Sequence, residues 1–232
     1  MVTPLAPPRL QVSGLTKHFQ HAPVLRGVDL QLAAGDCFAL FGANGAGKTT
    51  LLRVLATLQR PNGGQFSICG HDGVTRRDQA RRRVFVVAHG SHHYDELTAT
   101  ENLHFTLALH GIRTTSQQQA DALERVGLQS FAQARVRVFS SGMKKRLGLA
   151  KAMLLDSPLL LLDEPYAALD ESGMAMVNAF VRERLQAGAA VLMVSHDRQV
   201  SAEVATRAGV MKRGRIEETR VDALLAAKDW LT

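Results

Sequence analysis

Residues 37–50 constrain the fold more than any other stretch of this sequence. Cys37–Phe41 is a short apolar run typical of a buried strand, and the segment Gly42-Ala43-Asn44-Gly45-Ala46-Gly47-Lys48-Thr49-Thr50 follows it directly. That segment matches the phosphate-loop pattern G-x-x-x-x-G-K-[ST] at every fixed position. Glycines let backbone N–H groups converge on an anion, and a helix that begins at the end of the loop adds about half a positive charge. The sequence therefore predicts a strand, a phosphate-binding loop and a helix that runs to about Leu58, in that order.

The loop carries the groups that a nucleoside triphosphate and its magnesium ion require. We expect Lys48 to reach the outer phosphates and Thr49 to offer its hydroxyl to Mg²⁺, which prefers oxygen ligands. The other predicted nucleotide-binding residues are Gly42, Asn44, Gly45, Ala46, Gly47 and Thr50. A glycine-rich turn before an ordinary helix is the alternative, but the apolar strand before the loop and the amphipathic segment after it favour the phosphate site.

Length and composition are those of a soluble globular chain. The 232 residues are 46% hydrophobic and 21% charged, which suits one domain, or one domain with an inserted lobe. The sequence lacks a run of about 18 to 20 apolar residues and a signal-peptide core, so we expect a cytoplasmic protein that meets a membrane only through a partner. Cys37 and Cys69 are expected to be small buried residues rather than a disulfide or a metal site.

The net charge of +7 raises the question of nucleic acid binding. The main basic clusters are 76–83 and 144–146, and neither is interleaved with the aromatic residues that stack on bases. We expect both clusters to lie on a solvated face, and we predict no nucleic-acid partner.

The order of segments predicts an α/β fold with an insertion. Short apolar alternations before residue 33 indicate an antiparallel β segment, and apolar runs at 84–88, 159–162 and 190–194 indicate buried parallel strands. We expect a single domain, 1–232, with a parallel-sheet core and a β subdomain formed by 9–96 and 157–232. A helical subdomain, 97–156, is inserted, and 1–8 is a flexible leader.

A second motif follows the apolar run at 159–162. Asp163 and Glu164 end this predicted strand, and ligands of open α/β sheets gather beyond the carboxyl ends of the strands. We therefore expect Asp163 beside the phosphate loop, where it holds magnesium or a water bound to it, and Glu164 as the group that polarises an attacking water.

The third motif lies in the predicted helical insertion. Ser140, Ser141, Gly142 and Met143 precede an amphipathic helix and would offer backbone donors, a hydroxyl and a helix N-terminus to a phosphate. If this element and the phosphate loop hold the same nucleotide, one of them must come from a second chain.

These motifs together resemble the nucleotide-binding subunits of ATP-binding cassette (ABC) transporters, over nearly the whole chain. The phosphate loop, the signature at 139–143, Leu162-Asp163-Glu164-Pro165, Ala168-Leu169-Asp170 and Ser195-His196-Asp197 occur in the family's order. The resemblance implies a P-loop ATPase that forms a head-to-tail homodimer around two Mg-ATP molecules and energises a separate membrane permease from the inner face of the cell membrane. It assigns Phe19 to adenine stacking, Asp170 to communication across the dimer and His196, with Glu164, to catalysis.

A closer resemblance is to the ATP-binding subunits of haem exporters used in cytochrome c maturation, carried by His89, 94–99, 101–103, 139–143 and 163–166. Exporters of drugs, polysaccharides or antibiotics share many of these residues. A soluble cassette ATPase, for example in iron–sulfur assembly, is a less favoured alternative. A P-loop kinase would leave the signature and His196 unexplained.

The sequence departs from the family pattern at two places. The loop after 84–88 offers His89 or Gly90 where the family has a glutamine that touches magnesium, so we expect hydrolysis to persist while coupling to the permease is altered. Ser141 stands where the signature has its first glycine. The neighbouring His92 and His93 invite a metal or haem interpretation, but we expect a solvated loop there.

Overall fold

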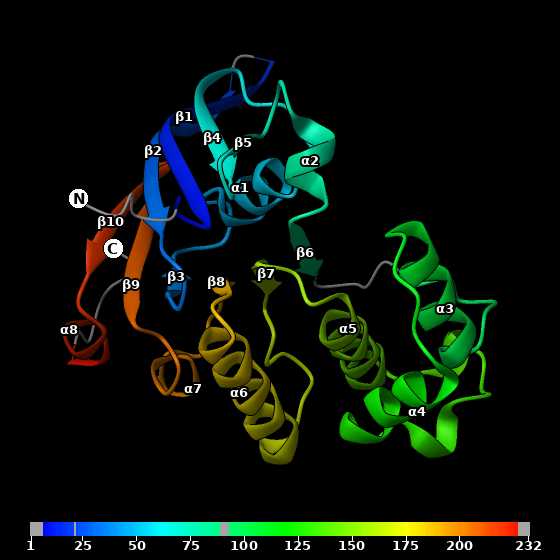
Figure 1. Ribbon diagram of the computed structural model, residues 1–232. Helices are drawn as coiled ribbons and strands as arrows, with labels where there is room; N and C mark the ends of the chain where they lie inside the picture. Colours follow the sequence, from blue (N-terminus) through cyan, green and yellow to red (C-terminus); the bar gives the residue numbers. More distant parts are fainter. Residues whose placement is uncertain (1–6, 21, 89–92, 227–232) are drawn as a thin grey trace, which may run out of the picture.

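The computed structural model describes residues 7–20, 22–88 and 93–226, which form two β-sheets and a group of helices (Figure 1). The strands are β1 Leu10–Phe19, β2 Ala22–Leu32, β3 Cys37–Phe41, β4 Gly63–Ile68, β5 His71–Asp72, β6 Val84–Val87, β7 Leu159–Asp163, β8 Ala190–Val194, β9 Arg207–Lys212 and β10 Arg215–Thr219. The helices are α1 Lys48–Leu55, α2 Arg77–Arg81, α3 Ala99–Leu109, α4 Ser116–Arg125, α5 Ser141–Leu155, α6 Glu171–Gln186, α7 Arg198–Ala202 and α8 Val221–Ala226, with short 3₁₀ turns at Gln129–Phe131 and Val136–Val138.

The larger sheet has the strand order β10-β9-β3-β8-β7-β6, in which all strands but β10 are parallel. Its central strands are apolar and buried along their length, as the sequence predicts for strands covered on both faces. Leu40 pairs with Val194, and Val194 pairs with Asp163. This register brings the carboxyl ends of β3, β8 and β7 to one edge of the sheet.

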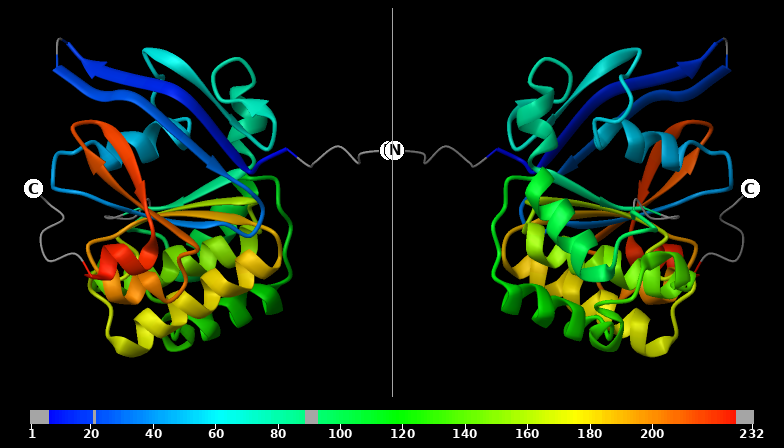
Figure 2. Two further views of the ribbon diagram at one scale, coloured as in Figure 1. Left: turned by 90° about the vertical axis from the view of Figure 1, so that its left-hand side faces the viewer. Right: turned by 90° about the vertical axis from the view of Figure 1, so that its right-hand side faces the viewer.

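Alternate residues of β7 and β8 face two different hydrophobic cores. Leu161 and Leu192 pack into a core that contains α1, β1, β2 and β4, whereas Leu162 and Met193 pack into a core that contains residues of α3–α6. Successive side chains of a strand point to opposite faces. The sheet therefore separates α1 from α5 and α6, as the views in Figure 2 show.

The smaller sheet is antiparallel, with the order β2-β1-β4-β5, and it shares the core of α1. It contains the antiparallel β segment that the sequence predicts before residue 33, together with β4 and β5. Together the two sheets confirm the predicted α/β class with a parallel core and an antiparallel segment. The subdomain limits at 9–96, 97–156 and 157–232 remain a prediction.

The inserted helices begin at local capping signals. Thr98 Oγ1 accepts a hydrogen bond from the Glu101 amide (3.2 Å), and the Glu101 carboxylate accepts one from the Thr98 amide (2.8 Å). Thr115 and Gln118 form the same reciprocal pair at the start of α4. Such a capping box satisfies backbone donors that have no partner within the helix. We call α3–α5 the helical lobe; it projects from the β6 and β7 side of the larger sheet (Figure 1).

One helix boundary and the burial of one cysteine differ from the predictions. The helix after the phosphate loop ends at Leu55 rather than near Leu58, since Thr57 has a left-handed backbone (φ 60°). Cys37 is buried, but Cys69 is partly exposed and is not the buried residue that we expected. In the part of the chain that the structure describes, no helix is both long and apolar enough to cross a membrane.

Candidate nucleotide-binding site

The phosphate loop joins β3 to α1 in a conformation that requires glycine at its two ends. Gly42 has φ 147°, and a Cβ placed on it would lie 2.6 Å from the Met211 carbonyl oxygen. Gly47 has φ 111° and forms the N-cap of α1. Both values lie in the region that L side chains rarely adopt. The loop backbone therefore leads tightly from β3 into α1, whose first amides, like those of any α-helix, have no partner within the helix.

Lys48 lies within this loop. Its Nζ donates hydrogen bonds to the carbonyl oxygens of Gly42 (2.6 Å) and Ala43 (3.0 Å), and the side chain is buried. Burial lowers the pKa of Lys48, whereas the negative charges of Glu164 and Asp163 act to raise it. The arrangement places a largely desolvated cation where the loop would meet a phosphate, which strengthens any charge–charge interaction there.

A cavity of about 450 Å³ opens between the loop and the carboxyl ends of β7 and β8. It is lined by Val24, Asn44, Gly45, Gly47, Lys48, Thr49, Thr50, Asp163, Glu164, Val194 and His196. Most of the predicted nucleotide-binding and catalytic residues therefore surround one space. Gly42 and Ala46 do not line it: Gly42 backs onto Met211, and Ala46 packs against the core of α1.

Glu164 and His196 contact one another across the ends of β7 and β8. His196 Nε2 lies 3.3 Å from Glu164 Oε1, and the His196 amide donates to Glu164 Oε2 (3.2 Å). The Glu164 amide donates to the Val194 carbonyl oxygen (2.8 Å), and Glu164 itself has φ 50°. A left-handed non-glycine residue of this kind stores about 1–3 kcal/mol of strain. The sheet and His196 thus hold the carboxylate at the rim of the cavity.

Thr49 and Asp163 line the same cavity, Thr49 from α1 and Asp163 from the end of β7. A hydroxyl and a carboxylate are hard oxygen donors, which suit Mg²⁺. No group of three or more His, Cys, Asp or Glu side chains suited to a metal occurs among the described residues. This donor set fits an ion that completes its shell with phosphate oxygens and water.

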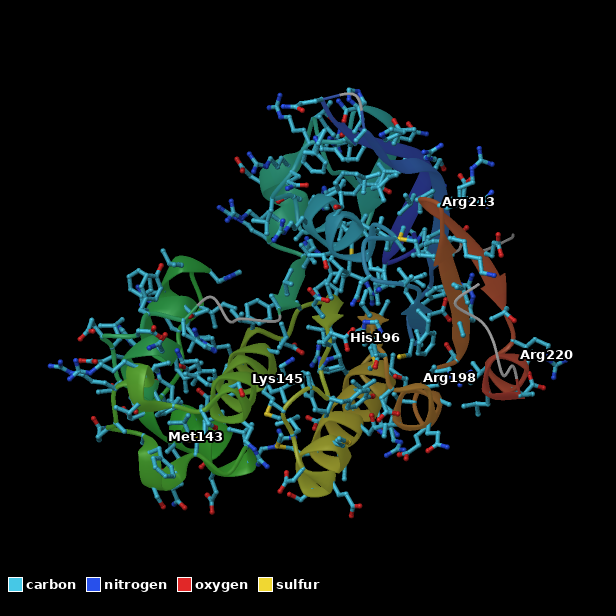
Figure 3. All side chains as sticks on the ribbon, turned by 180° about the vertical axis from the view of Figure 1, so that it is seen from behind. Met143, Lys145, His196, Arg198, Arg213 and Arg220 are labelled. Carbon is cyan, nitrogen blue, oxygen red and sulfur yellow. The ribbon has the colours of Figure 1, made fainter. Side chains whose placement is uncertain are left out.

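The signature residues lie elsewhere. Ser140 is the N-cap of α5, and its hydroxyl accepts a hydrogen bond from the Met143 amide (3.2 Å). None of residues 140–143 lines the cavity at the phosphate loop, because α5 and α1 pack on opposite faces of the sheet. Figure 3 shows Met143 on the helical lobe and His196 at the core. Within one copy, the structure does not bring the signature to the phosphate loop.

Asp170 caps α6 and also contacts the helical lobe. Its carboxylate accepts hydrogen bonds from the Gly173 amide (3.0 Å) and the Ser172 hydroxyl (3.0 Å), and it pairs with Arg146 of α5 at 2.9 Å. Hydrogen bonding from Gly173 and Ser172, with a smaller effect of Arg146, lowers the pKa of Asp170. The carboxylate therefore joins α6 to α5 in the same copy.

Phe19 ends β1 and is 46% exposed. It pairs with Ala22 in the β1–β2 register, and Lys17 Nζ lies 5.2 Å from the centre of its ring. Phe19 does not itself line the cavity, but Val24 on the adjoining strand does. Its ring is thus an accessible aromatic surface near the cavity, and adenine stacking stays a prediction.

His89 and Gly90, the candidates for the missing glutamine, lie outside the described residues, as does His92. His93 is described, and it is not the solvated side chain that we expected. Its Nδ1 lies 2.9 Å from Lys151 Nζ, and its Nε2 lies 2.7 Å from the Lys144 carbonyl oxygen. Both ring nitrogens are engaged, which leaves His93 no position for a metal or haem iron. Burial, and then the charge of Lys151, lowers its pKa to about 4.

Two side chains of the basic run 144–146 also differ from the solvated face that we predicted. Lys145 is buried and contacts the main chain at Asp163 and Glu164, and Arg146 forms the bond to Asp170 described above. In sequence these residues look like an ordinary charged stretch. The spacing from Ser140 alone could have placed them on the first turns of α5, but not against the core.

A phosphate loop between a parallel strand and a helix, with two carboxylates at the end of a nearby strand, defines a P-loop nucleoside triphosphatase. The family model for ABC transporters matches residues 25–167. The chain belongs to the ABC transporter family and is one of its ATP-binding, ATP-hydrolysing subunits.

Curated relatives extend over most of the chain. It is 41% identical to the cytochrome c biogenesis ATP-binding export protein CcmA of Xanthomonas oryzae pv. oryzae, over 89% of this chain and 96% of that protein. It is 35% identical to the daunorubicin resistance ATP-binding protein DrrA3 of Streptomyces coeruleorubidus, over 96% of this chain and 71% of that protein.

Solved structures show the same fold. An ATP-binding subunit of an ABC transporter superposes with a TM-score of 0.85 at 25% identity, over 93% of this chain and 91% of that one. The ATP-binding cassette MJ0796, described as a dimer in a post-hydrolysis state bound to ADP and phosphate, superposes with a TM-score of 0.84 at 23% identity. The match covers 91% of this chain and 98% of that one.

Proposed function

We propose that this subunit works as a head-to-tail homodimer, in which the phosphate loop of one copy and the signature of the other hold the same ATP. The observation that carries the proposal is that the two elements suited to phosphate, the N-termini of α1 and α5, lie on opposite faces of one sheet. A helix N-terminus favours an anion through its free amides and dipole. One copy offers each ATP a single such terminus, and a second copy supplies the other.

In this arrangement Lys48 and the first amides of α1 bind the outer phosphates, and Phe19 stacks on the adenine. Thr49 and Asp163 would hold Mg²⁺, which neutralises charge on the phosphate oxygens. Glu164 accepts a proton from the attacking water, whose oxygen bonds to the γ-phosphorus while the bond to the β-phosphate oxygen breaks. His196, which contacts Glu164, orients that water and the γ-phosphate.

The cycle energises a separate membrane permease that docks on the helical lobe. A hollow of about 330 Å³ lies between this lobe and the core, and its rim includes the exposed apolar side chains of Leu58, Tyr94 and Leu109. Arg81 and Lys144 add positive charge to the same rim. Exposed apolar side chains rimmed by charge are typical of a protein interface. Docking there would hold the subunit on the inner face of the cell membrane.

The cargo that we propose is haem for cytochrome c biogenesis. The support is the 41% identity to CcmA, which extends over almost the full length of both proteins. Export of a drug or another small molecule is the alternative, favoured by the 35% identity to a daunorubicin resistance protein that is longer than this chain. A soluble role such as iron–sulfur assembly stays the less favoured alternative.

Dimer formation can be tested with the Glu164→Gln variant. Loss of a general base typically lowers the rate about 10² to 10⁴-fold, so this variant should bind ATP, hydrolyse it slowly and accumulate as a dimer in size-exclusion chromatography with light scattering. Adding Ser140→Glu, which sets an acidic group against the phosphates, should abolish the dimer while the phosphate loop still binds ATP. A wild-type protein that stays monomeric at every stage of turnover would overturn the proposal.

The cargo requires a cellular experiment. Deletion of the gene should reduce covalent haem attachment to c-type cytochromes, and the wild-type gene, but not the Glu164→Gln gene, should restore it. If the deletion strain attaches haem to its c-type cytochromes normally but becomes more sensitive to a drug, haem is excluded as the cargo and drug export is supported. Co-purification of a multi-span membrane protein tests the permease independently of the cargo.

A further inference from the structure

Lys145 connects the helical lobe to the candidate catalytic residues within one copy. It lies on α5, is only 7% exposed, and directs its Nζ at the carbonyl oxygens of Asp163 (3.5 Å) and Glu164. Figure 3 places Lys145 on the side of α5 that faces the strand ends of the core. No feature of the phosphate loop or of the signature requires a cation at this position.

The main chain that Lys145 contacts is strained. Glu164 has φ 50°, a conformation that persists only where the surroundings impose it. Its amide is held by the Val194 carbonyl oxygen, and its carboxylate by His196. Its carbonyl oxygen accepts from Lys145 and from the Ala167 amide (3.3 Å). The core therefore fixes the amide and the side chain of Glu164, and Lys145 of the helical lobe holds its carbonyl oxygen together with Ala167.

Lys145 also borders a space other than the nucleotide cavity. It lines the hollow between the helical lobe and the core, together with Phe85, Leu109 and Lys151. The residues that line this hollow and those that line the nucleotide cavity are separate sets. Lys145 thus borders the hollow beside the helical lobe, and it contacts the main chain of Asp163 and Glu164, which line the nucleotide cavity.

The electrostatic setting of Lys145 agrees with a positional role. Burial lowers its pKa, and the charges of Glu164 and Asp163 partly oppose that effect. A buried ammonium is unfavourable unless hydrogen bonds compensate, and the two carbonyl oxygens supply them. A change in the position of α5 would alter this bond, because Lys145 moves with the helix while Glu164 stays with the sheet.

We propose that Lys145 is a positioning residue for ATP hydrolysis. Its ammonium holds the turn at Glu164 in the conformation that directs the carboxylate at the nucleotide cavity. Because Lys145 belongs to α5, that conformation depends on the position of the helical lobe. The inference rests on the proposed role of Glu164 as general base. It assigns to Lys145 an effect on the chemical step and none on ATP binding, since Lys48 and the phosphate loop do not contact it.

The test compares Lys145→Met, which keeps the length of the side chain but removes the charge and the donors, with Lys145→Arg, which keeps both. Steady-state ATPase assays on the full-length chain should show kcat reduced about 10 to 100-fold in Lys145→Met, as expected for a misplaced catalytic group, with KM for ATP within about twofold of wild type. Lys145→Arg should recover most of the lost rate. The control is Arg125→Met, which removes an exposed cation of the helical lobe that pairs with Glu183 and should leave basal turnover unchanged.

Wild-type kcat in Lys145→Met would overturn the inference, and so would equal losses in the Met and Arg variants. If Lys145→Met does not fold, Lys145→Gln is measured against the same criteria. Glu164→Gln, assayed in parallel, separates the two proposals. Normal turnover of Glu164→Gln would refute the general base itself, whereas an inactive Glu164→Gln beside an unaffected Lys145→Met would refute only the role of Lys145.

Discussion

Arg146 on α5 and Asp170 at the N-terminus of α6 form an ion pair in which the nearest nitrogen and oxygen lie 2.9 Å apart. Arg146 also donates to the Val126 carbonyl oxygen at the end of α4 (3.1 Å). One guanidinium therefore connects two helices of the helical lobe to the loop that follows Glu164. The residue expected to communicate across a dimer is already connected, within its own copy, to the helix that bears the signature.

This connection predicts non-additive effects of substitution. Arg146→Gln and Asp170→Asn should each lower the kcat of ATP hydrolysis. The kcat of the double variant should lie within about twofold of that of the less active single variant, because both changes remove the same contact. Asparagine still caps a helix, so Asp170→Asn should be more stable to urea than Asp170→Ala. Strictly multiplicative losses of kcat would show that the two residues act independently.

Gly142 should tolerate no side chain, even in a single copy without nucleotide. A Cβ on Gly142 would lie 2.6 Å from the Ala168 carbonyl oxygen, which belongs to backbone with φ 62°. Gly142→Ala should therefore lower the free energy of unfolding by about 1 to 3 kcal/mol, the usual range for overpacking. Urea denaturation measures this effect, and Ser141→Ala, at an exposed position, is the matched control. Equal stability of Gly142→Ala and wild type would contradict the prediction.

Phe19 should contribute to ATP affinity only through its contact with the adenine ring. Stacking of a base on an aromatic side chain is worth about 1 to 3 kcal/mol, so Phe19→Ala should raise KM for ATP by about 5 to 150-fold with little change in kcat. Phe19→Tyr should behave like wild type. Inhibition by inorganic triphosphate, which has no base, should be the same in all three proteins. A parallel loss of triphosphate affinity would mean that Phe19 supports the loop rather than the adenine.

His93 should make the protein less stable in acid. Its pKa is lowered to about 4, whereas an unfolded chain has the ordinary value near 6.5, so the unfolded state binds more protons as the pH falls between these values. The groups that face the ring are Lys151, Lys144 and, with an opposing effect, Asp95. Stability contributed by neutral His93 is complete above pH 6.5 and is lost as the pH falls towards 4.

The corresponding measurement is urea denaturation at pH 7 and pH 5. Wild type should lose about 1 to 2 kcal/mol more than His93→Gln over this interval, since one pKa unit corresponds to about 1.4 kcal/mol. An identical pH dependence in the two proteins would show that His93 titrates normally in the folded state.

Much of the site could be predicted because its signals are local. The phosphate loop is a continuous segment, and the register of parallel strands places Asp163 and Glu164 beside it once β3, β7 and β8 are recognised. The contacts of Lys145 and His93 could not be predicted in this way. Each joins residues from different secondary-structure elements, and in sequence both look like solvated polar side chains.

The sequence by itself determined the elements whose cause lies within a few residues: the phosphate-loop segment 42–49, the capped start of α6 at Asp170, and the buried strands at 159–163 and 190–194. Only the tertiary structure decided that α1 and α5 pack on opposite faces of the sheet, and that Lys145 is buried against Glu164. The physical reason is that strand and helix signals act over short stretches of backbone. Burial and charge contacts instead depend on which distant segments the packed cores bring together.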